Sequence, residues 1–364
     1  MSGNGGTRSV SVEGLLEDIR TRFRELGRKV VRLMEVCGTH TMSIARAGLR
    51  DLLPEGLKLT SGPGCPVCVT STGYIDAAID LASRPGITTT TFGDMIRVPG
   101  TKGTLEAAKA QGADVRVVYS PMKSLEIAQA RPERTVVFLG VGFETTAPAT
   151  ATLIECAAES RTTNLAVLPA HKLIPPALRV IASDPGLRVD GFLLPGHVSV
   201  ILGTAPYEFL ATEFSLPCVI TGFEPQDILE AISMLLDRIS SGKPEVQNQY
   251  RKVVRPEGNP EARRRVMEVF RTADASWRGF GVIPQSGLAV RDEYAQWDAA
   301  RRFAIRVAPE EPETGCLCGD VLKGKVHPRE CPLFGGRCTP ASAVGPCMVS
   351  SEGACAASFR FERR

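Results

Sequence analysis

The sequence predicts an α/β protein with two similar Rossmann-like domains, each built on a parallel sheet, and a small irregular or helical domain at the C-terminus. Three observations lead to this prediction. Short apolar segments alternate with segments of helical periodicity over most of the chain, which is typical of parallel sheets covered by helices on both faces. Motifs that follow the predicted strands recur in weakly similar form, and six of the eleven cysteines lie in the last fifty residues.

The first series of elements follows the alternation in chain order. A helix is expected at 14–26, where charged residues separate apolar residues at helical spacing, and VVRLMEVC (30–37) is typical of a buried strand. The same patterns place the later elements at 42–53 (helix), 57–62 (strand), 74–83 (helix), 87–92 (strand), 104–113 (helix) and 114–120 (strand).

A second series begins at TVVFLGV (135–141), which is again a short apolar run typical of a strand. The elements that follow are expected at 147–159 (helix), 164–170, 191–196 and 216–222 (strands) and 226–242 (helix). Two pairs of motifs suggest an internal duplication: CGTHT (37–41) with GFETTA (142–147), and PGCPVC (63–68) with PGHVSV (195–200). Chance similarity is the alternative explanation.

Composition excludes some classes of protein. The chain has 364 residues, and 43 basic and 40 acidic side chains give a formal net charge of +3, without a basic run interleaved with aromatic residues. A nucleic-acid partner is therefore not expected. No apolar stretch reaches the roughly 18 residues of a membrane span, and the polar N-terminus lacks the apolar core of a signal peptide. A disordered N-terminal tail and a cytoplasmic location are expected.

Cysteines in a reducing compartment are more often metal ligands or redox groups than structural disulfides. Cys156 and Cys218 each stand alone in apolar segments and are expected in the core. Cys65 and Cys68 have the spacing of a reversible dithiol or of half a metal site, and the spacing does not decide between them.

If the two series are copies of one unit, the loops after their strands face one cleft, where open α/β sheets bind ligands. The residues expected in this cleft are Cys37, His40, Cys65, Cys68, Glu144 and His197.

Each candidate also has a structural explanation. Under this explanation, Cys37 is a core residue at the end of a strand, and His40 caps the helix that follows. Glu144 precedes a helix whose dipole favours a carboxylate, and His197 lies in a surface loop.

The C-terminal segment, GCLCGDVLKGKVHPRECPLFGGRCTPASAVGPCMVSSEGAC, is rich in glycine and proline and has few aliphatic residues. Such a segment buries too little apolar surface to fold alone, so a metal centre is expected to organise it. Four thiolates hold either zinc or a [4Fe–4S] cluster, and the single close pair, Cys316 and Cys318, favours the cluster over zinc.

Five motifs together resemble the HypD family of maturation factors for [NiFe]-hydrogenases: CGTHT, SGPGCPVC, GFETTAPA, LLPGHVSVI and CMVSSEGACAA. They extend from Cys37 to Ala357, so the resemblance covers nearly the whole chain. It implies two similar α/β domains (29–130 and 131–242) and a [4Fe–4S] domain (243–364), on which the N-terminal tail and helix (1–28) pack.

The resemblance also implies cofactors, partners and residue roles. The protein would be the scaffold and redox factor on which, with HypC, an Fe(CN)2(CO) group is assembled, using cyanide delivered by HypE, which HypF charges. The spacing C-x14-C-x6-C-x16-C of the family's cluster ligands matches Cys316, Cys331, Cys338 and Cys355, which leaves Cys318 and Cys347 as a thiol pair beside the cluster.

In this interpretation Cys37 holds the iron that carries cyanide and CO, and His40 and Glu144 orient groups or exchange protons there. Cys65 and Cys68 are a redox dithiol, and a metal site of three thiolates that includes Cys37 is the alternative. Two other functions are kept: a [4Fe–4S]-dependent thiol reductase acting on protein disulfides, and a structural zinc protein with an α/β ligand-binding module.

Overall fold

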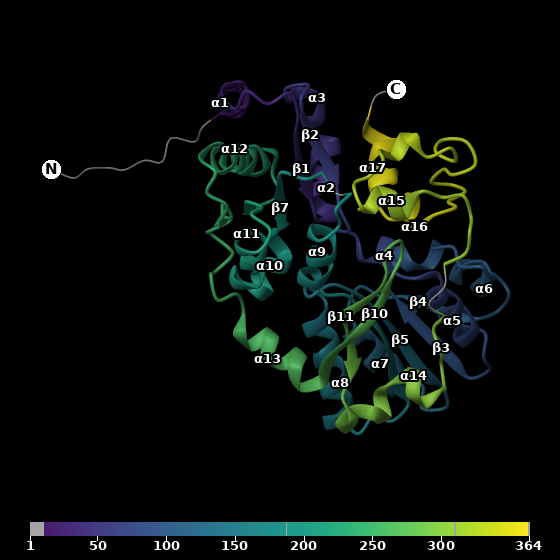
Figure 1. The fold of residues 1–364 in the computed structure, drawn as a ribbon. Coiled ribbons are helices and arrows are strands. Elements are labelled where there is room, and N and C mark those ends of the chain that lie inside the picture. The colour runs from purple at the N-terminus through teal and green to yellow at the C-terminus, as the bar shows by residue number, and fades with distance from the viewer. Residues whose placement is uncertain (1–10, 187, 309–310, 363–364) are drawn as a thin grey trace.

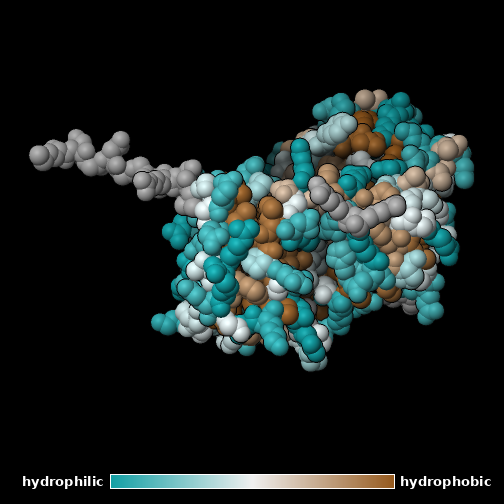
Figure 2. Space-filling model, turned by 90° about the horizontal axis from the view of Figure 1, so that it is seen from above, coloured by the Kyte–Doolittle hydropathy of each residue, from teal (hydrophilic) through white to brown (hydrophobic). Residues whose placement is uncertain are grey.

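The computed structural model describes residues 11–186, 188–308 and 311–362. Two parallel sheets lie side by side, and a long antiparallel hairpin packs on one of them (Figure 1). The C-terminal helices lie next to the N-terminal strands and next to elements from the middle of the chain (Figure 1). No helix within these residues is both long and apolar enough to cross a bilayer. The face drawn in Figure 2 carries hydrophilic residues interspersed with smaller apolar areas.

Sheet 1 has five parallel strands in the order β2 (Leu57–Ser61), β1 (Val31–Glu35), β7 (Gly191–Pro195), β8 (Cys218–Thr221) and β9 (Val246–Asn248). The central strands are apolar and fully buried at most positions, as expected for strands covered on both faces.

Sheet 2 has four parallel strands in the order β4 (Asp114–Val117), β3 (Ile87–Thr91), β5 (Thr135–Gly142) and β6 (Leu165–His171). The β3 sequence ITTTT is buried throughout, and one of its hydroxyls, from Thr90, lies 2.8 Å from the Ser124 hydroxyl. Both sheets are thus parallel, and the predicted fold class is confirmed at this level.

The helices that connect and flank the strands are α1 (Val12–Glu25), α2 (Gly38–Arg46), α3 (Leu49–Leu52), α4 (Pro66–Val69), α5 (Thr72–Ala82), α6 (Leu105–Ala110), α7 (Met122–Ala130), α8 (Ala147–Glu159), α9 (Ile174–Ala182), α10 (Gly196–Leu202), α11 (Glu208–Thr212), α12 (Pro225–Ser241) and α13 (Pro260–Val269). Two 3-10 helices interrupt this series, η1 (Gly93–Arg97) and η2 (Ala205–Tyr207).

Local sequence explains where several helices begin and end. The predicted helix 42–53 forms as two helices, because Gly48 takes a left-handed conformation with φ of 63° between α2 and α3. Helix α12 begins at a capping box formed by Glu224 and Asp227 and ends at Gly242, with φ of 65°. Helices α7, α9 and α10 were missing from the sequence prediction.

The C-terminal third begins with the hairpin of β10 (Phe270–Trp277) and β11 (Gly281–Val290), which packs on sheet 2 through β6. It continues with η3 (Asp292–Trp297), α14 (Ala299–Arg302), α15 (Cys318–Leu322), η4 (Pro328–Glu330), α16 (Pro346–Val349) and α17 (Ala354–Phe361). The cysteine-rich segment therefore starts well after residue 243. Residues 246–302 supply the last strand of sheet 1, β9, and the hairpin that packs on sheet 2.

The strand order corrects the predicted division of the chain. Sheet 1 joins β1 and β2 from 29–130 to β7 and β8 from 131–242, and sheet 2 also draws on both ranges. The chain leaves sheet 1 after β2, builds sheet 2, and returns. The proposed duplication is not supported by this order, because PGCPVC and PGHVSV follow two strands of the same sheet.

The N-terminal helix also differs from the prediction. Helix α1 packs along α12, to which it is tied by an ion pair of 3.1 Å between Arg22 and Asp237 (Figure 1). It buries Leu15, Leu16 and Ile19 in the core of sheet 1. The expectation that it lies on the C-terminal domain is therefore wrong. Helix α17 is the element that joins the C-terminus to the N-terminal half, by packing against α2.

Candidate functional site

A cleft of about 320 Å³ lies where the carboxyl ends of strands from both sheets meet. Its walls come from the loops after β1, β2 and β7 of sheet 1 and after β3 and β5 of sheet 2, together with the segment between α16 and α17. The polar side chains that line it are those of Cys37, Thr39, Asp94, Thr145, Thr146, His197, Ser350 and Glu352. Loops from distant parts of the sequence thus converge on one cleft.

Backbone contacts hold the Cys37 loop against the Cys65 loop. The N–H of Gly38 donates to the carbonyl of Gly64 at 2.8 Å, and that of Gly62 donates to the carbonyl of Glu35 at 2.7 Å. A Cβ atom on Gly64 would lie 2.2 Å from the backbone nitrogen of Cys37. Only glycine permits this approach, which explains the glycines of the GPGCPVC motif.

Cys37 precedes α2 and is 8% exposed. Burial, opposed by backbone hydrogen bonds from His40 and Thr39 and aided by the carboxylates of Glu352 and Glu35, raises the pKa of its thiol to about 12. The thiol is therefore protonated at neutral pH in the absence of a bound cation.

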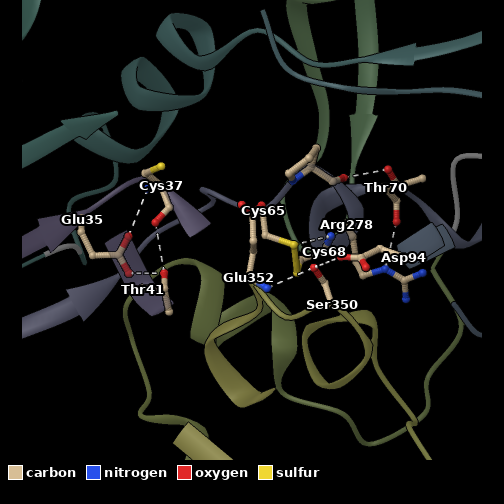
Figure 3. The surroundings of a disulfide bond; sticks show 11 residues. Glu35, Cys37, Thr41, Cys65, Cys68, Thr70, Asp94, Arg278, Ser350 and Glu352 are labelled. Atoms are coloured by element: carbon tan, nitrogen blue, oxygen red, sulfur yellow. Dashed lines mark hydrogen bonds between the residues drawn. A yellow bond between two sulfur atoms is a disulfide. The ribbon is translucent and has the colours of Figure 1, made fainter. Parts of the chain in front are cut away.

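Glu35 is a member of the site that the sequence analysis missed. It is fully buried, its Oε1 accepts a hydrogen bond of 2.5 Å from Thr41 Oγ1, and its Oε2 accepts one of 3.1 Å from the backbone of Cys37 (Figure 3). Burial raises its pKa to about 7. The signal was an acidic residue within an apolar strand, where a charge is otherwise costly.

Glu352 and Asp94 were also missed. Glu352 Oε1 accepts a hydrogen bond of 3.0 Å from Thr39 Oγ1. The hydroxyl of Ser350 donates to Asp94 at 2.7 Å (Figure 3). Burial, opposed by the bond from Thr39 and aided by the charge of Asp94, raises the pKa of Glu352. Both carboxyls line the cleft beside Cys37, so the site is acidic.

The two histidines occupy different positions. His197 is exposed and lines the cleft, whereas His40 is fully buried behind it, with Nε2 2.9 Å from the carbonyl oxygen of Gly222. Phe223 lies against both rings, with centroids 3.9 Å from His197 and 5.0 Å from His40. Burial lowers the pKa of both, that of His40 to about 4. His40 is thus neutral and supports the cleft from behind.

Glu144 points away from the cleft, into a separate apolar pocket of about 210 Å³. Its Oε1 accepts a hydrogen bond of 2.8 Å from the backbone of Ile174, and its Oε2 has no partner among the described residues. Burial raises its pKa to about 7. The neighbouring Thr145 and Thr146 line the cleft instead.

Cys65 and Cys68 form a disulfide at the start of α4, with Cα atoms 5.2 Å apart (Figure 3). Both residues are buried, at 3% and 0% exposure, whereas thiol–disulfide exchange requires access to one of the sulfur atoms. Pro66 and Val67 between them do line the cleft. The disulfide therefore lies just beneath the cleft wall, and on its other side α4 packs against α16, which carries Cys347.

The six C-terminal cysteines line one small cavity between α15, α16 and α17: Cys316, Cys318, Cys331, Cys338, Cys347 and Cys355. Gly345 closes the wall, because a Cβ there would lie 2.7 Å from Cys316 Sγ. Among the described residues, no three Cys, His, Asp or Glu side chains are grouped closely enough to hold a single metal ion. Six thiols around a cavity are the donor type that iron–sulfur clusters use.

The remaining cysteines behave as predicted for core residues. Cys218 is fully buried in β8, and burial raises the pKa of its thiol above the usual range. Cys156 is partly buried in α8 and packs against the core of sheet 2.

Comparison with known proteins shows similarity over nearly the whole chain. Residues 10–362 match the model of the HypD family, described as the hydrogenase formation hypA family. The hydrogenase maturation factor HypD2 of Bradyrhizobium diazoefficiens is 47% identical over 344 residues, which cover 92% of this chain and 90% of that protein. The hydrogenase maturation factors HypD of Escherichia coli and Rhodobacter capsulatus are 45% and 44% identical, over 96% of this chain and 95% of each protein.

Proposed function

Because this chain belongs to the HypD family of hydrogenase formation proteins and acts in hydrogenase maturation, we propose that it is the scaffold on which the Fe(CN)2(CO) group is assembled. The iron with its cyanide and CO ligands is the cargo of this process. HypC shares the ligation of the iron in this proposal, HypE delivers cyanide, and HypF supplies HypE. The assembly takes place in the cytoplasm.

The position of Cys37 carries the proposal. Its thiol lies at a cleft that loops from both sheets form, beside two carboxyls and an exposed histidine. Iron that carries cyanide and CO is a soft centre for which thiolate is a suitable ligand. When the cation arrives, the thiol of Cys37 loses its proton, because a coordinating thiol is deprotonated by the metal charge. The carboxylate of Glu352, whose pKa is raised, accepts that proton.

The two histidines have separate roles in this proposal. His197 faces the cargo, and His40 positions it through Phe223, which lies against both rings. The direct proton-exchange role expected for His40 does not fit its burial, because its imidazole is neutral and does not line the cleft. Glu144 acts from outside the cleft, where it holds the start of α9 through Ile174.

Cys65 and Cys68 act as a redox dithiol in this proposal. Reduction of their disulfide takes two electrons and two protons, breaks the S–S bond and leaves two thiols. The packing of α4 against α16 supports electron delivery from the side of the C-terminal cysteines, while Pro66 and Val67 place the pair next to the cargo.

The cavity of six cysteines fits the [4Fe–4S] cluster that the family resemblance implies. Cys316, Cys331, Cys338 and Cys355 would hold it, and Cys318 and Cys347 would form the thiol pair beside it. Such a cluster supplies single electrons when it is bound. The protein's own contribution is to seal the site, since each of the ligand positions except Cys316 is buried.

The test is an infrared spectrum of the full chain, purified anaerobically after co-expression with HypC. Cyanide and CO bound to iron absorb where protein does not, so their bands should appear in the complex. A purified complex that contains iron but lacks these bands would overturn the scaffold role.

The thiol reductase remains the second candidate, because the disulfide adjoins the C-terminal cysteines. A Cys65→Ser, Cys68→Ser double variant tests the redox dithiol that both functions require, and disulfide turnover without HypC separates the two functions. Under the scaffold proposal the double variant fails to support hydrogenase maturation, and both single Ser variants fail equally, since one thiol cannot form the disulfide. Single variants that keep most maturation activity would exclude a redox dithiol. Turnover of protein disulfides without HypC would favour the reductase, and a colourless preparation that contains zinc would favour a structural zinc site.

A further inference from the structure

The tip of the β10–β11 hairpin lies between the Cys65–Cys68 loop and the C-terminal cysteines. On one side, Trp277 pairs with Thr70, and the backbone of Arg278 donates to the carbonyl of Val69 at 2.8 Å. On the other side, Gly279 lies so close to Gly319, the residue after Cys318, that a Cβ on Gly279 would be 2.4 Å from its Cα. The hairpin tip thus joins α4 to the start of α15.

Arg278 places a buried guanidinium at this junction, with 9% of the residue exposed. Its Nε donates to the carbonyl of Thr70 at 3.1 Å, and its Nη1 lies 3.4 Å from the carboxylate of Glu311. Its Nη2 is buried without a partner among the described residues. Burying a charged group with an unused hydrogen-bond donor is costly, so we expect Arg278 to have a second role besides its contacts with Thr70 and Glu311.

Glu311 holds the guanidinium without enclosing it. Its carboxylate accepts hydrogen bonds from the backbone and the hydroxyl of Thr72, at 2.9 and 2.5 Å. It is therefore anchored at the start of α5, directly after the disulfide loop. Arg278 and Glu311 thus place one fixed positive and one fixed negative charge in this loop region.

Charged side chains of both signs surround the disulfide. The carboxyl groups of Asp94 and Glu352 line the cleft and disfavour additional negative charge on a sulfur atom, and Figure 3 shows Asp94 on the same side of the disulfide as Arg278. Arg278 lies on the side of the disulfide away from Cys37 (Figure 3). A nearby arginine stabilises a thiolate, and a disulfide whose reduced form is stabilised is more readily reduced.

We infer that Arg278 is a positioning residue that holds its fixed charge beside the Cys65–Cys68 pair and thereby favours reduction of this disulfide. The inference rests on the proposed redox role of the pair. Two electrons and two protons convert the disulfide to two thiols, and in the test two glutathione thiols supply them and become one glutathione disulfide. One of the two protein thiols then releases its proton to the buffer and remains a thiolate, and Arg278 stabilises this reduced form through its charge.

The experiment measures the fraction of reduced Cys65 and Cys68 by thiol trapping and mass spectrometry in a series of glutathione redox buffers. Arg278→Gln should need an about tenfold more reducing glutathione ratio for half reduction, which corresponds to about 30 mV. Arg278→Lys keeps the charge and should stay within twofold of the wild type. Glu311→Gln keeps one hydrogen-bond acceptor for Thr72 but removes the opposing charge, and it should shift the midpoint in the opposite direction.

The outcomes separate the inference from the proposed function. If the Cys65–Cys68 disulfide of the wild type can be titrated with glutathione but Arg278→Gln does not shift its midpoint, only the role of Arg278 is overturned. Equal midpoint shifts in the Gln and Lys variants also overturn that role, because they indicate a hydrogen-bond effect on the loop. If the wild-type disulfide does not respond to the glutathione buffers, both the role of Arg278 and the proposed redox role of the pair are overturned. If Arg278→Gln does not fold, as judged by circular dichroism, an unchanged midpoint in Glu311→Gln overturns the inference.

Discussion

Cys37 has an environment unlike that of a nucleophilic cysteine. Reactive thiols usually lie beside cations that lower their pKa. Cys37 instead is buried beside the carboxyls of Glu35 and Glu352, and burial, aided by these carboxyls, raises its pKa to about 12. A thiol in such a site stays protonated until a cation binds, and the same carboxyls attract that cation. These charges support metal ligation over nucleophilic catalysis.

The first prediction concerns this thiol. Cys37→Ala should keep the fold, because Ala fits wherever Cys does, but should abolish the infrared bands of cyanide and CO in the complex with HypC. Cys218→Ala is the matched control, since it makes the same change at a buried position of β8. The control should keep the bands and lose about 1 kcal/mol of stability. Bands of undiminished strength in Cys37→Ala would disprove the ligand role.

The second prediction uses the raised pKa of Glu35. A carboxyl whose pKa is about 7 in the folded state and 4.5 in the unfolded state binds more protons when folded between these values. Its contribution to stability is therefore present below pH 4.5 and is lost as the pH rises to about 7. Glu35→Gln has no such proton to lose. Between pH 5 and pH 8, the free energy of unfolding of the variant should therefore rise by about 2 kcal/mol relative to that of the wild type.

Denaturant unfolding at the two pH values measures this difference. The comparison is between variant and wild type at each pH, which cancels the titration of groups that both proteins share, among them Glu144. An equal difference in the free energy of unfolding at pH 5 and pH 8 would show that Glu35 has an ordinary pKa in the folded protein.

At the scale of elements, the cleft depends on close contact between the loops after β1 and β2. These strands are neighbours in sheet 1, in register from Val31 with Leu57 to Glu35 with Ser61. Their loops then continue the contact through glycine backbones, without space for side chains. The position of Cys37 relative to the disulfide is thereby fixed by main-chain atoms, which do not adjust as side chains do.

The third prediction tests this contact. Gly64→Ala would place a methyl group 2.2 Å from the Cys37 nitrogen, so the loops must separate, and the protein should lose about 1–3 kcal/mol of stability together with its maturation activity. Gly93→Ala is the matched control at the same cleft, where the nearest atom is 3.6 Å away. Thermal unfolding and a maturation assay in cells compare the two. Equal effects of both changes would contradict the argument.

At the scale of the whole molecule, the C-terminal helix α17 packs at the site against α2, the helix that follows Cys37. Helix α17, which carries Cys355, packs against α2, and Glu352 just before α17 bonds to Thr39 in α2. A salt bridge of 3.0 Å between Arg50 and Glu362 extends this contact. A structural change at the C-terminal cysteines is thus transmitted to the cleft through the packing of α17 against α2.

The fourth prediction follows from this link. If a cluster organises the C-terminal segment, Ala at Cys316, Cys331, Cys338 or Cys355 should bleach the brown anaerobic protein, because ligation there replaces an apolar core. Amide hydrogen exchange should also speed up in α17 and at the start of α2. Ala at Cys318 or Cys347 should leave the colour. Bleaching by either of these changes, with colour retained in Cys316→Ala, would show that the ligand set is wrong.

The sequence by itself determined the fold class, most of the strands and the family. Apolar runs such as 135–141 and 164–170 correspond closely to β5 and β6, because strands buried on both faces must be apolar throughout. The motifs placed Cys37, His197 and the loop of Cys65 and Cys68 at the carboxyl ends of strands, where parallel sheets gather their functional residues.

Only the tertiary structure decided how these pieces combine. Strand order depends on packing between segments distant in sequence, so local periodicity could not show that the chain leaves sheet 1 and later returns to it. Burial decided the protonation of Cys37, Glu35 and His40, since the pKa of a group depends on its surroundings. For the same reason, no pattern in the sequence indicated that Glu144 turns away from the cleft, or that Arg278 comes to lie beside a disulfide about 210 residues away along the chain.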